Sequence, residues 1–330
     1  MTSKEWVKSL HYLKPYQIEK VSNMVAEYLS LNKELDDIRP TICPKCGAVD
    51  AKFIKKGIAN RRQRFQCKCC NKKFTYDTMQ LTSHSHQPVE SWLLVLNDTL
   101  SLTPIWKTEQ SIGVCHTTAL YMRHKLLAYL ELLFDDEQKL NAMVEADETY
   151  VPESQKGVKV KHRKPRKHGE GVGKRGISSE QLCVCVATDR DNHVVAKCVN
   201  RARPTSSDIE EAIGSHIDSG SVIMCDGAAA YNELVKHTQS QKVELKGRES
   251  YDKVYHLNTV NGLHSRFKAM IRQYRGVSTK YLNRYLALFM VLSCSNMNMN
   301  ELADGVRRKL GATRSDITAE SAKTLRLLTI

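Results

Sequence analysis

The chain has 330 residues and a formal net charge of +14 at pH 7, from 50 Lys and Arg against 36 Asp and Glu. Single hydrophobic cores rarely grow beyond about 250 residues, so this length predicts two or three domains. The basic balance favours a polyanionic partner such as nucleic acid, with a generically basic protein as the alternative, and no apolar run approaches the ~18 residues of a membrane span.

The first segment, residues 1–38, is predicted to be helical because apolar residues recur at helical spacing from Tyr12 to Leu29. It contains no motif that points to a function. Its first residues lack the apolar core of a signal peptide, which predicts a cytoplasmic location.

Two Cys-x-x-Cys pairs come next, in a chain whose eleven cysteines are an odd number. The pairs are Cys43 with Cys46, and Cys67 with Cys70. This pattern indicates a reducing compartment and metal binding rather than a disulfide framework. Four thiolates in two knuckles suit tetrahedral Zn²⁺, so residues 39–80 are predicted to form a zinc ribbon. Cys69 is the spare thiol, although Cys67 and Cys69 could exchange roles.

Residues 51–75 hold nine Lys and Arg and no acid. Four aromatic residues are interleaved with them: Phe53, Phe65, Phe74 and Tyr76. A basic segment with aromatic side chains is typical of a nucleic-acid clamp. The alternative is that zinc merely holds up a small fold whose charges are solvated.

Residues 86–138 are predicted to be a helical DNA-binding region. Helices are expected from Pro88 to Leu100, from Pro104 to Ile112, and again after the Gly113–Val114 turn. Two helices joined by a short glycine turn fit a helix-turn-helix, whose later helix contacts base edges or phosphates. The candidate contacts on that helix are Thr117, Thr118, Arg123 and Lys125. The alternative is a helical linker that packs on the next domain.

From Leu140 the pattern changes to strands and helices in the order β-β-β-α-β-α-β-α, which predicts a mixed α/β sheet. The expected strands are 143–151, 181–188, 193–200, 221–227 and 243–245, and the expected helices are 207–217, 228–235 and one beginning near 259. This is the order of an RNase H-like nucleotidyl-transferase core, assigned here to residues 140–302. The apolar helix after Thr279 is expected to cover the sheet.

Two further stretches are less informative. The run from Lys156 to Arg175 is rich in Gly, Lys and Arg. It predicts a flexible loop that either contacts the DNA backbone or is simply solvated. The tail, residues 303–330, holds three consecutive basic residues and gives no functional prediction.

Three oxygen-bearing side chains are candidates for a divalent-metal site. Asp147 lies on the first expected strand and Asp226 ends the fourth, so their carboxylates are expected side by side. Asn261 lies on the helix after the fifth strand. Phosphoryl transfer on DNA uses two cations about 3.5–4 Å apart held by oxygen ligands, so this set predicts a site for Mg²⁺ or Mn²⁺. For Asp226 the alternative is a helix N-cap.

These motifs resemble those of bacterial insertion-sequence DDE-type transposases of the ISXO-like group. The matching segments are Val144–Val151, Asp226–Gly227 and His256–Asn261, with Lys268 seven residues beyond. The resemblance implies that Asp147, Asp226 and Asn261 are catalytic metal ligands. It also implies that Lys268 contacts a DNA phosphate.

Asn261 departs from the family pattern, which has Glu at this position, and resembles the subgroup ending in Asn. An amide oxygen carries no charge, so it would hold the second metal more weakly. Glu145, on the same strand face as Asp147, or His264 is a candidate to compensate.

The resemblance implies a transposase that binds the terminal inverted repeats of its own insertion sequence, cleaves their 3′ ends and joins them to target DNA. Its partners would be double-stranded DNA, as element ends and target, and further copies of the chain at the bacterial nucleoid, because pairing two ends requires a dimer or larger. One alternative is a zinc-dependent DNA-binding regulator with an inert RNase H-like domain. Another is an RNase H-like nuclease that cleaves without joining.

Overall fold

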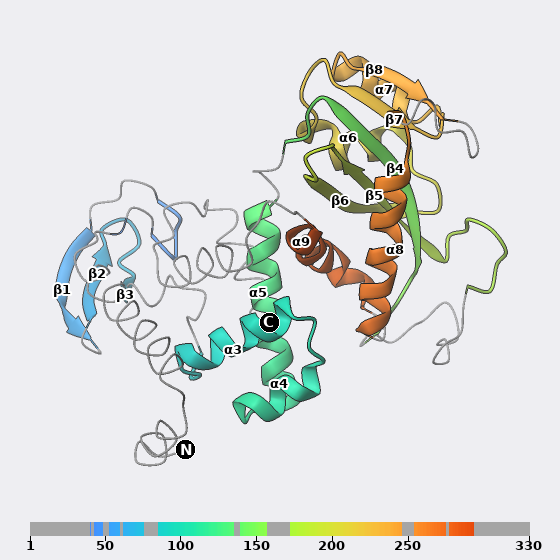
Figure 1. Cartoon of the computed structure of the whole chain (residues 1–330). Helices are drawn as coiled ribbons and strands as arrows, with labels where there is room; N and C mark the ends of the chain where they lie inside the picture. The colour runs from blue at the N-terminus through green and yellow to red at the C-terminus, as the bar shows by residue number, and fades with distance from the viewer. Residues whose placement is uncertain are drawn as a thin grey trace, which may run out of the picture. The chain divides into compact units, whose positions relative to one another are not determined.

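Figure 1 shows the computed structural model of the chain. The structure describes residues 40, 43–48, 53–59, 62–75, 85–134, 139–156, 172–245, 254–274 and 277–293. The predicted N-terminal helix, most of the basic run after Lys156 and the C-terminal tail lie outside these residues. The described residues fall into two compact units, which divide after Val89. Within them, no helix is both long and apolar enough to cross a membrane.

The first unit contains a small antiparallel sheet. Its strands, in the order β1-β2-β3, are β1 (Phe53–Ala59), β2 (Arg62–Cys67) and β3 (Lys73–Thr75). Phe65 and Phe74 form the core of this sheet with buried cysteines, and the ring of Phe53 meets Phe74 edge to face at 5.6 Å. Phe65 and Phe74 are only 4% and 3% exposed, so they hold the unit together. They are therefore not available to contact nucleic acid, in contrast to the clamp that the interleaved aromatic residues suggested.

The second unit begins with three helices at the predicted places. They are α3 (Val89–Leu100), α4 (Ile105–Ile112) and α5 (His116–Phe134). Gly113 ends α4 in the left-handed conformation, with φ of 69°, and donates its N–H to the carbonyl of Glu109. Along α5 the buried side chains lie on several sides of the helix, because it packs both on α4 and on α9 (Leu282–Ser293).

The rest of this unit is a mixed α/β fold around a five-stranded sheet, as predicted. Its strands, in the order β6-β5-β4-β7-β8, are β4 (Met143–Pro152), β5 (Gln181–Thr188), β6 (Val194–Arg201), β7 (Val222–Cys225) and β8 (Gln241–Glu244). The pairs β4–β5 and β5–β6 are antiparallel, whereas β4–β7 and β7–β8 are parallel. The β5 sequence is a continuous apolar run because helices cover both faces of the sheet.

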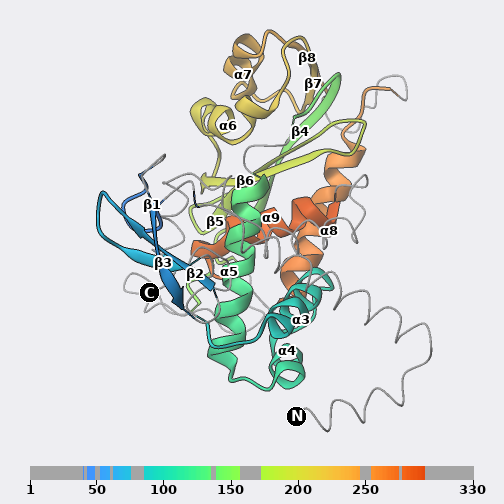
Figure 2. The same cartoon turned by 90° about the vertical axis from the view of Figure 1, so that its left-hand side faces the viewer.

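The helices form the outer layers of this fold (Figures 1 and 2). On one face lie α6 (Ser206–Ile213) and α7 (Tyr231–His237), which enclose a core with β4, β5 and β7. On the other face lie α8 (Asn258–Gln273) and α9. The predicted apolar cover after Thr279 is therefore confirmed, since α9 packs on β6 and is buried along most of its length.

Two helix boundaries differ from the prediction for local reasons. Thr205 and Asp208 form a capping box, so α6 begins at Ser206, and it gives way at Gly214 to a short 3-10 turn. The helix expected from Ala228 begins only at Tyr231. Gly227 adopts φ of 87° and Ala228 donates its N–H to the Asp226 carboxylate, which makes the intervening residues a turn.

Candidate active site

Parallel pairing of β4 and β7 brings Asp147 and Asp226 to the same edge of the sheet. In this register Glu145 lies opposite Met224. Asp147 and Asp226 each follow two residues later, and side chains two apart share a face of a sheet. Because neighbouring strands lie about 4.8 Å apart, Asp147, in the middle of β4, and Asp226, directly after the last residue of β7, occupy adjacent positions.

The surroundings of Asp147 disfavour its ionised form. Burial raises the pKa of Asp147 to about 6 from an ordinary 3.8, and the charges of Glu148 and Asp226 add to the rise. The Lys268 ammonium and the backbone N–H of Glu148, which donates to Asp147 at 2.9 Å, act in the opposite direction. The positive charge around these carboxylates does not compensate for burial and their mutual repulsion. A bound cation would stabilise the ionised form of Asp147.

The third predicted residue lies on α8, which packs on β4 and β5. Asn261, His264 and Lys268 occupy positions i, i+3 and i+7, so they share one stripe of the helix. His264 Nδ1 is 3.9 Å from a carboxylate oxygen of Asp147, while Asn261 and Lys268 are exposed. The structure therefore places Asn261 one helical turn before the residue that faces Asp147.

His264 is a neutral neighbour of this site. Burial, together with the nearby Lys268 charge, lowers the pKa of His264 to about 4. Its Nε2 atom is buried, with no hydrogen-bond partner among the described residues. At 3.9 Å its contact with the Asp147 carboxylate is too long for a hydrogen bond, but a hydrogen bond to the Asp147 backbone ties the imidazole to β4 and partly offsets the fall in its pKa.

Glu145 does not have the free carboxylate that compensation for Asn261 would need. Both of its oxygens accept hydrogen bonds from the start of α8: Oε2 from the backbone N–H groups of Thr259 at 2.9 Å and Val260 at 3.0 Å, and Oε1 from the Thr259 hydroxyl at 2.8 Å. Arg190 also pairs with it. The expectation that Glu145 offers a spare metal ligand is therefore wrong in this arrangement.

Glu148 is a carboxylate beside the site that the sequence motifs did not single out. It lies on the opposite strand face from Asp147, where burial and the charge of Asp226 raise its pKa. Tyr231, on α7, hydrogen-bonds it, and its Oε1 atom is buried with no hydrogen-bond partner in the part of the chain that the structure describes. The only sequence signal was an acid at an inward position of a buried strand.

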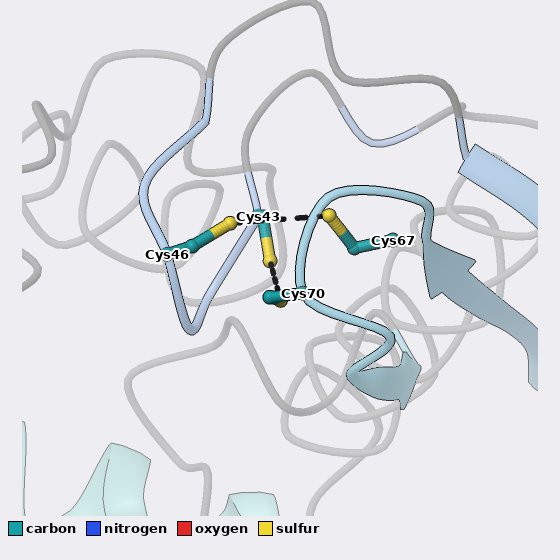
Figure 3. A group of neighbouring side chains, drawn as sticks. All are labelled: Cys43, Cys46, Cys67 and Cys70. Atoms are coloured by element: carbon teal, nitrogen blue, oxygen red, sulfur yellow. Dashed lines mark hydrogen bonds between the residues drawn. The ribbon is translucent and has the colours of Figure 1, made fainter.

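Four cysteine sulfurs converge in the first unit (Figure 3). Cys43, Cys46, Cys67 and Cys70 each offer a sulfur within 4.8 Å of the others. The Cys43–Cys70 and Cys46–Cys67 sulfur distances are 3.5 and 3.9 Å. A Zn–S bond of 2.3 Å in a tetrahedron gives S–S distances of about 3.8 Å, so the cluster has the dimensions for Zn²⁺. Cys69 is exposed and lies outside this set, which resolves the ambiguity between Cys67 and Cys69.

The two cysteine turns have the same backbone design. Gly47 and Asn71 follow the second cysteine of each pair with positive φ, 68° and 57°. Each donates its N–H to the carbonyl of the first cysteine, Cys43 or Cys67, at 3.0 Å. Gly and Asn are the residues that adopt this conformation most readily, so the sequence encodes both turns locally.

The structure separates the four predicted DNA contacts on α5. Thr117 is exposed and Thr118 half-buried at the start of the helix. Arg123 is buried and donates to the Thr103 carbonyl and the Thr108 hydroxyl, and Lys125 is buried over the ring of Trp92. Arg123 and Lys125 therefore cannot reach DNA from these positions. Helical periodicity did not reveal this, because α5 is covered on more than one side.

Comparison with known proteins identifies the class of the sheet domain. Residues 139–290 match the family model of the ISXO2-like transposase domain. An uncharacterized protein in transposable element ISH50 of Halobacterium salinarum is 28% identical over 260 residues, covering 76% of this chain and 84% of that protein. These two matches confirm the resemblance of residues 139–290 to insertion-sequence transposases of the ISXO-like group that the sequence motifs indicated.

Distant similarity to solved structures also exists. A simian T-cell lymphotropic virus intasome in complex with PP2A regulatory subunit B56 gamma contains a chain 12% identical to this one, with a TM-score of 0.30, over 62% of this chain and 69% of that chain. A pre-cleavage Mos1 transpososome contains one that is 11% identical, with a TM-score of 0.27, over 71% of this chain and 76% of that chain.

Proposed function

We propose that the chain binds the terminal inverted repeats of its own insertion sequence and catalyses metal-dependent 3′-end cleavage and strand transfer, in an RNase H-like catalytic domain. The observation that carries this proposal is the parallel register of β4 and β7. Within a transposase domain, it sets Asp147 and Asp226 side by side at the edge that α8 flanks.

Asp147, Asp226 and Asn261 would hold Mg²⁺ or Mn²⁺, because carboxylate and amide oxygens are the ligands these hard cations take. The raised pKa of Asp147 supports this fit, since burial and the neighbouring Glu148 and Asp226 charges disfavour a carboxylate that a bound cation would stabilise. When bound, such cations activate the attacking oxygen and stabilise the leaving oxygen of the DNA strand. Asn261 brings no charge, so we expect weaker metal binding than with a third carboxylate.

Around this centre, the chain's own residues would hold the DNA. The exposed Lys268 ammonium lies on the Asn261 stripe, close enough to lower the Asp147 pKa, and would contact a phosphate next to the reacting one. Thr117 and Thr118, at the start of α5, would contact DNA through the helix-turn-helix. The zinc-bound ribbon would add sequence-independent phosphate contacts through its lysines and arginines. Two paired ends would require at least two copies of the chain.

A strand-transfer assay tests the proposal. Full-length protein, DNA carrying the element ends and Mg²⁺ should yield 3′-cleaved and joined products. Asp226→Asn should reduce both products by at least about 100-fold, since removing a metal-ligand charge affects both chemical steps. Asp218→Asn, an exposed aspartate before the same strand, is the matched control and should retain activity.

The same assay separates the alternatives. A DNA-binding regulator would bind the ends tightly, in a salt-sensitive manner, and cleave under no divalent metal. A nuclease would cleave and never join. Full activity of the Asp226→Asn protein would overturn the metal-site assignment.

A further inference from the structure

The structure points to a second group of residues beneath the proposed metal site. We propose that Glu145 and Arg190 are positioning residues, which fix the start of α8 against the two strands that carry Asp147 and Asp226. This inference rests on the proposed function, because the site that they position is the proposed metal site. We refer to Glu145, Arg190, His256, Thr259 and Val260 as the Glu145 cluster.

The N–H groups at the start of α8 take their acceptors from side chains outside the helix. Its N-cap residue, Leu257, makes no side-chain cap, and its first turn contains no acid. The free N–H groups at a helix start need acceptors, and a negative charge there is favoured by the helix dipole. Glu145 supplies both from a strand 114 residues earlier, through its bonds to Thr259 and Val260.

Arg190 ties further segments to the same carboxylate. It lies in the β5–β6 turn, and its guanidinium pairs with Glu145. It also donates to the Val254 carbonyl at 2.7 Å and lies 3.6 Å from the Met224 sulfur on β7. His256 completes the group, with Nδ1 3.2 Å from Glu145. The pair between the buried Glu145 carboxylate and the partly exposed Arg190 guanidinium therefore joins β4, β7, the β5–β6 turn and the segment that leads into α8.

The residues that make these contacts lie next to the proposed metal ligands in the sequence. On each of β4, β7 and α8, one contact residue comes one or two positions before one proposed ligand, and together these contact residues form a layer. The pairs are Glu145 and Asp147 on β4, Met224 and Asp226 on β7, and Val260 and Asn261 on α8. A shift of α8 along β4 would break the contacts of the layer and move Asn261 relative to both aspartates.

Energetics favour a positioning role over a purely stabilising one. Glu145 is 1% exposed whereas the Arg190 side chain is 32% exposed, so the carboxylate loses its solvation while solvent partly screens the attraction. Such a pair adds little stability over apolar residues of the same size, yet it specifies geometry through several directed bonds. The engagement of both carboxylate oxygens also makes Glu145 a support rather than a metal ligand.

Mn²⁺ binding to the zinc-loaded full-length chain, measured by electron paramagnetic resonance, tests the proposal independently of activity. Glu145→Gln should weaken Mn²⁺ binding about 10-fold, the usual effect of losing a residue that orients a metal ligand. The matched control is Glu153→Gln. Glu153 is also buried and paired with an arginine, Arg201, and it lies just beyond the end of the same strand. This control should bind Mn²⁺ as the wild type does.

A double-mutant cycle separates positioning from general destabilisation. If Glu145 acts through Asn261, then Glu145→Gln in the Asn261→Ala background should weaken Mn²⁺ binding less than about 2-fold. Hydrogen exchange of the Thr259 and Val260 amides should accelerate at least about 10-fold in Glu145→Gln and stay unchanged in Glu153→Gln. If Glu145→Gln does not fold, Arg190→Lys is the second variant. It keeps the positive charge but loses the hydrogen bond to the Val254 carbonyl, and it should weaken Mn²⁺ binding and accelerate amide exchange to a smaller extent.

The outcomes distinguish the two proposals. Two outcomes would overturn the positioning role while leaving the metal site intact. In the first, Glu145→Gln weakens Mn²⁺ binding equally in the wild-type and Asn261→Ala backgrounds. In the second, Glu145→Gln accelerates amide exchange but leaves Mn²⁺ binding unchanged. If Asp226→Asn alters neither Mn²⁺ binding nor strand transfer, the proposed function fails, and the positioning role fails with it.

Discussion

Asp147 is the residue at which the chemistry of the proposed site is concentrated. It shares a sheet edge with Asp226, faces His264 from α8 and is largely buried. A carboxyl in such a place is expected to hold its proton more tightly than in water unless a cation is bound. From this environment we expect a specific pH dependence of stability when no divalent cation is present.

The pH dependence of stability should reveal the environment of Asp147. Its pKa is raised to about 6 from 3.8, so its contribution to stability is present below pH ~4 and is lost as the pH rises through about 6. In magnesium-free buffer, Asp147→Asn should therefore gain about 1–2 kcal/mol relative to wild type between pH 4 and 7, after allowing for partial exposure. Urea unfolding across this range measures the difference, and a constant difference would contradict the prediction.

Among the elements, α5 shows how a motif and its packing can differ. Its place after the Gly113 turn agrees with the predicted helix-turn-helix, yet it is also a supporting helix for the sheet domain. His124 contacts the rings of Tyr281 and Tyr285, and the Arg284 side chain lies 3.7 Å from Glu131. The two readings of this region, DNA contact and packing, therefore apply to different positions of one helix.

Arg123 and Thr117 provide a test of this division. Arg123→Met removes the donor to the Thr103 carbonyl and the Thr108 hydroxyl, so it should destabilise the chain by about 1–3 kcal/mol. The dependence of DNA affinity on salt concentration should stay unchanged, because no phosphate contact is lost. Thr117→Ala should leave stability unchanged and weaken DNA binding. Unfolding curves and binding titrations at several salt concentrations measure these effects, and a lower salt slope for Arg123→Met would place this residue at the DNA after all.

At the level of the whole chain, two compact units have separate cores. The ribbon core consists of the phenylalanines and cysteines around Phe74, whereas the larger core lies between the five-stranded sheet and α6 and α7. The ribbon core is small, so its stability should depend on zinc. The sheet unit should not share this dependence.

Zinc loss should therefore unfold one unit and leave the other folded. Cys43→Ser should abolish tight zinc binding and accelerate amide exchange in residues 53–75, with no change in residues 181–225. Cys69→Ser is the matched control, because Cys69 is exposed and outside the sulfur cluster, and it should bind one zinc per chain. Loss of zinc from Cys69→Ser, or unfolding of both units in Cys43→Ser, would contradict this description.

Local patterns in the sequence determined much of this protein. The Cys-x-x-Cys turns, the glycine that ends α4, the alternation along β4 and the apolar run of β5 act over a few residues, so they could be predicted with their elements. The adjacency of Asp147 and Asp226 could be expected from the strand order, because it makes β4 and β7 parallel neighbours.

Only the tertiary structure decided which polar side chains are bound to partners within the chain and which remain available to ligands. Arg123 and Glu145 carry charges that a sequence pattern assigns to DNA or metal, and each is instead held inside by partners far away in the chain. Periodicity reports the face of an element, whereas the neighbours of that face depend on how distant elements pack. For this reason the Glu145 cluster, which joins four segments, was beyond the reach of any local pattern.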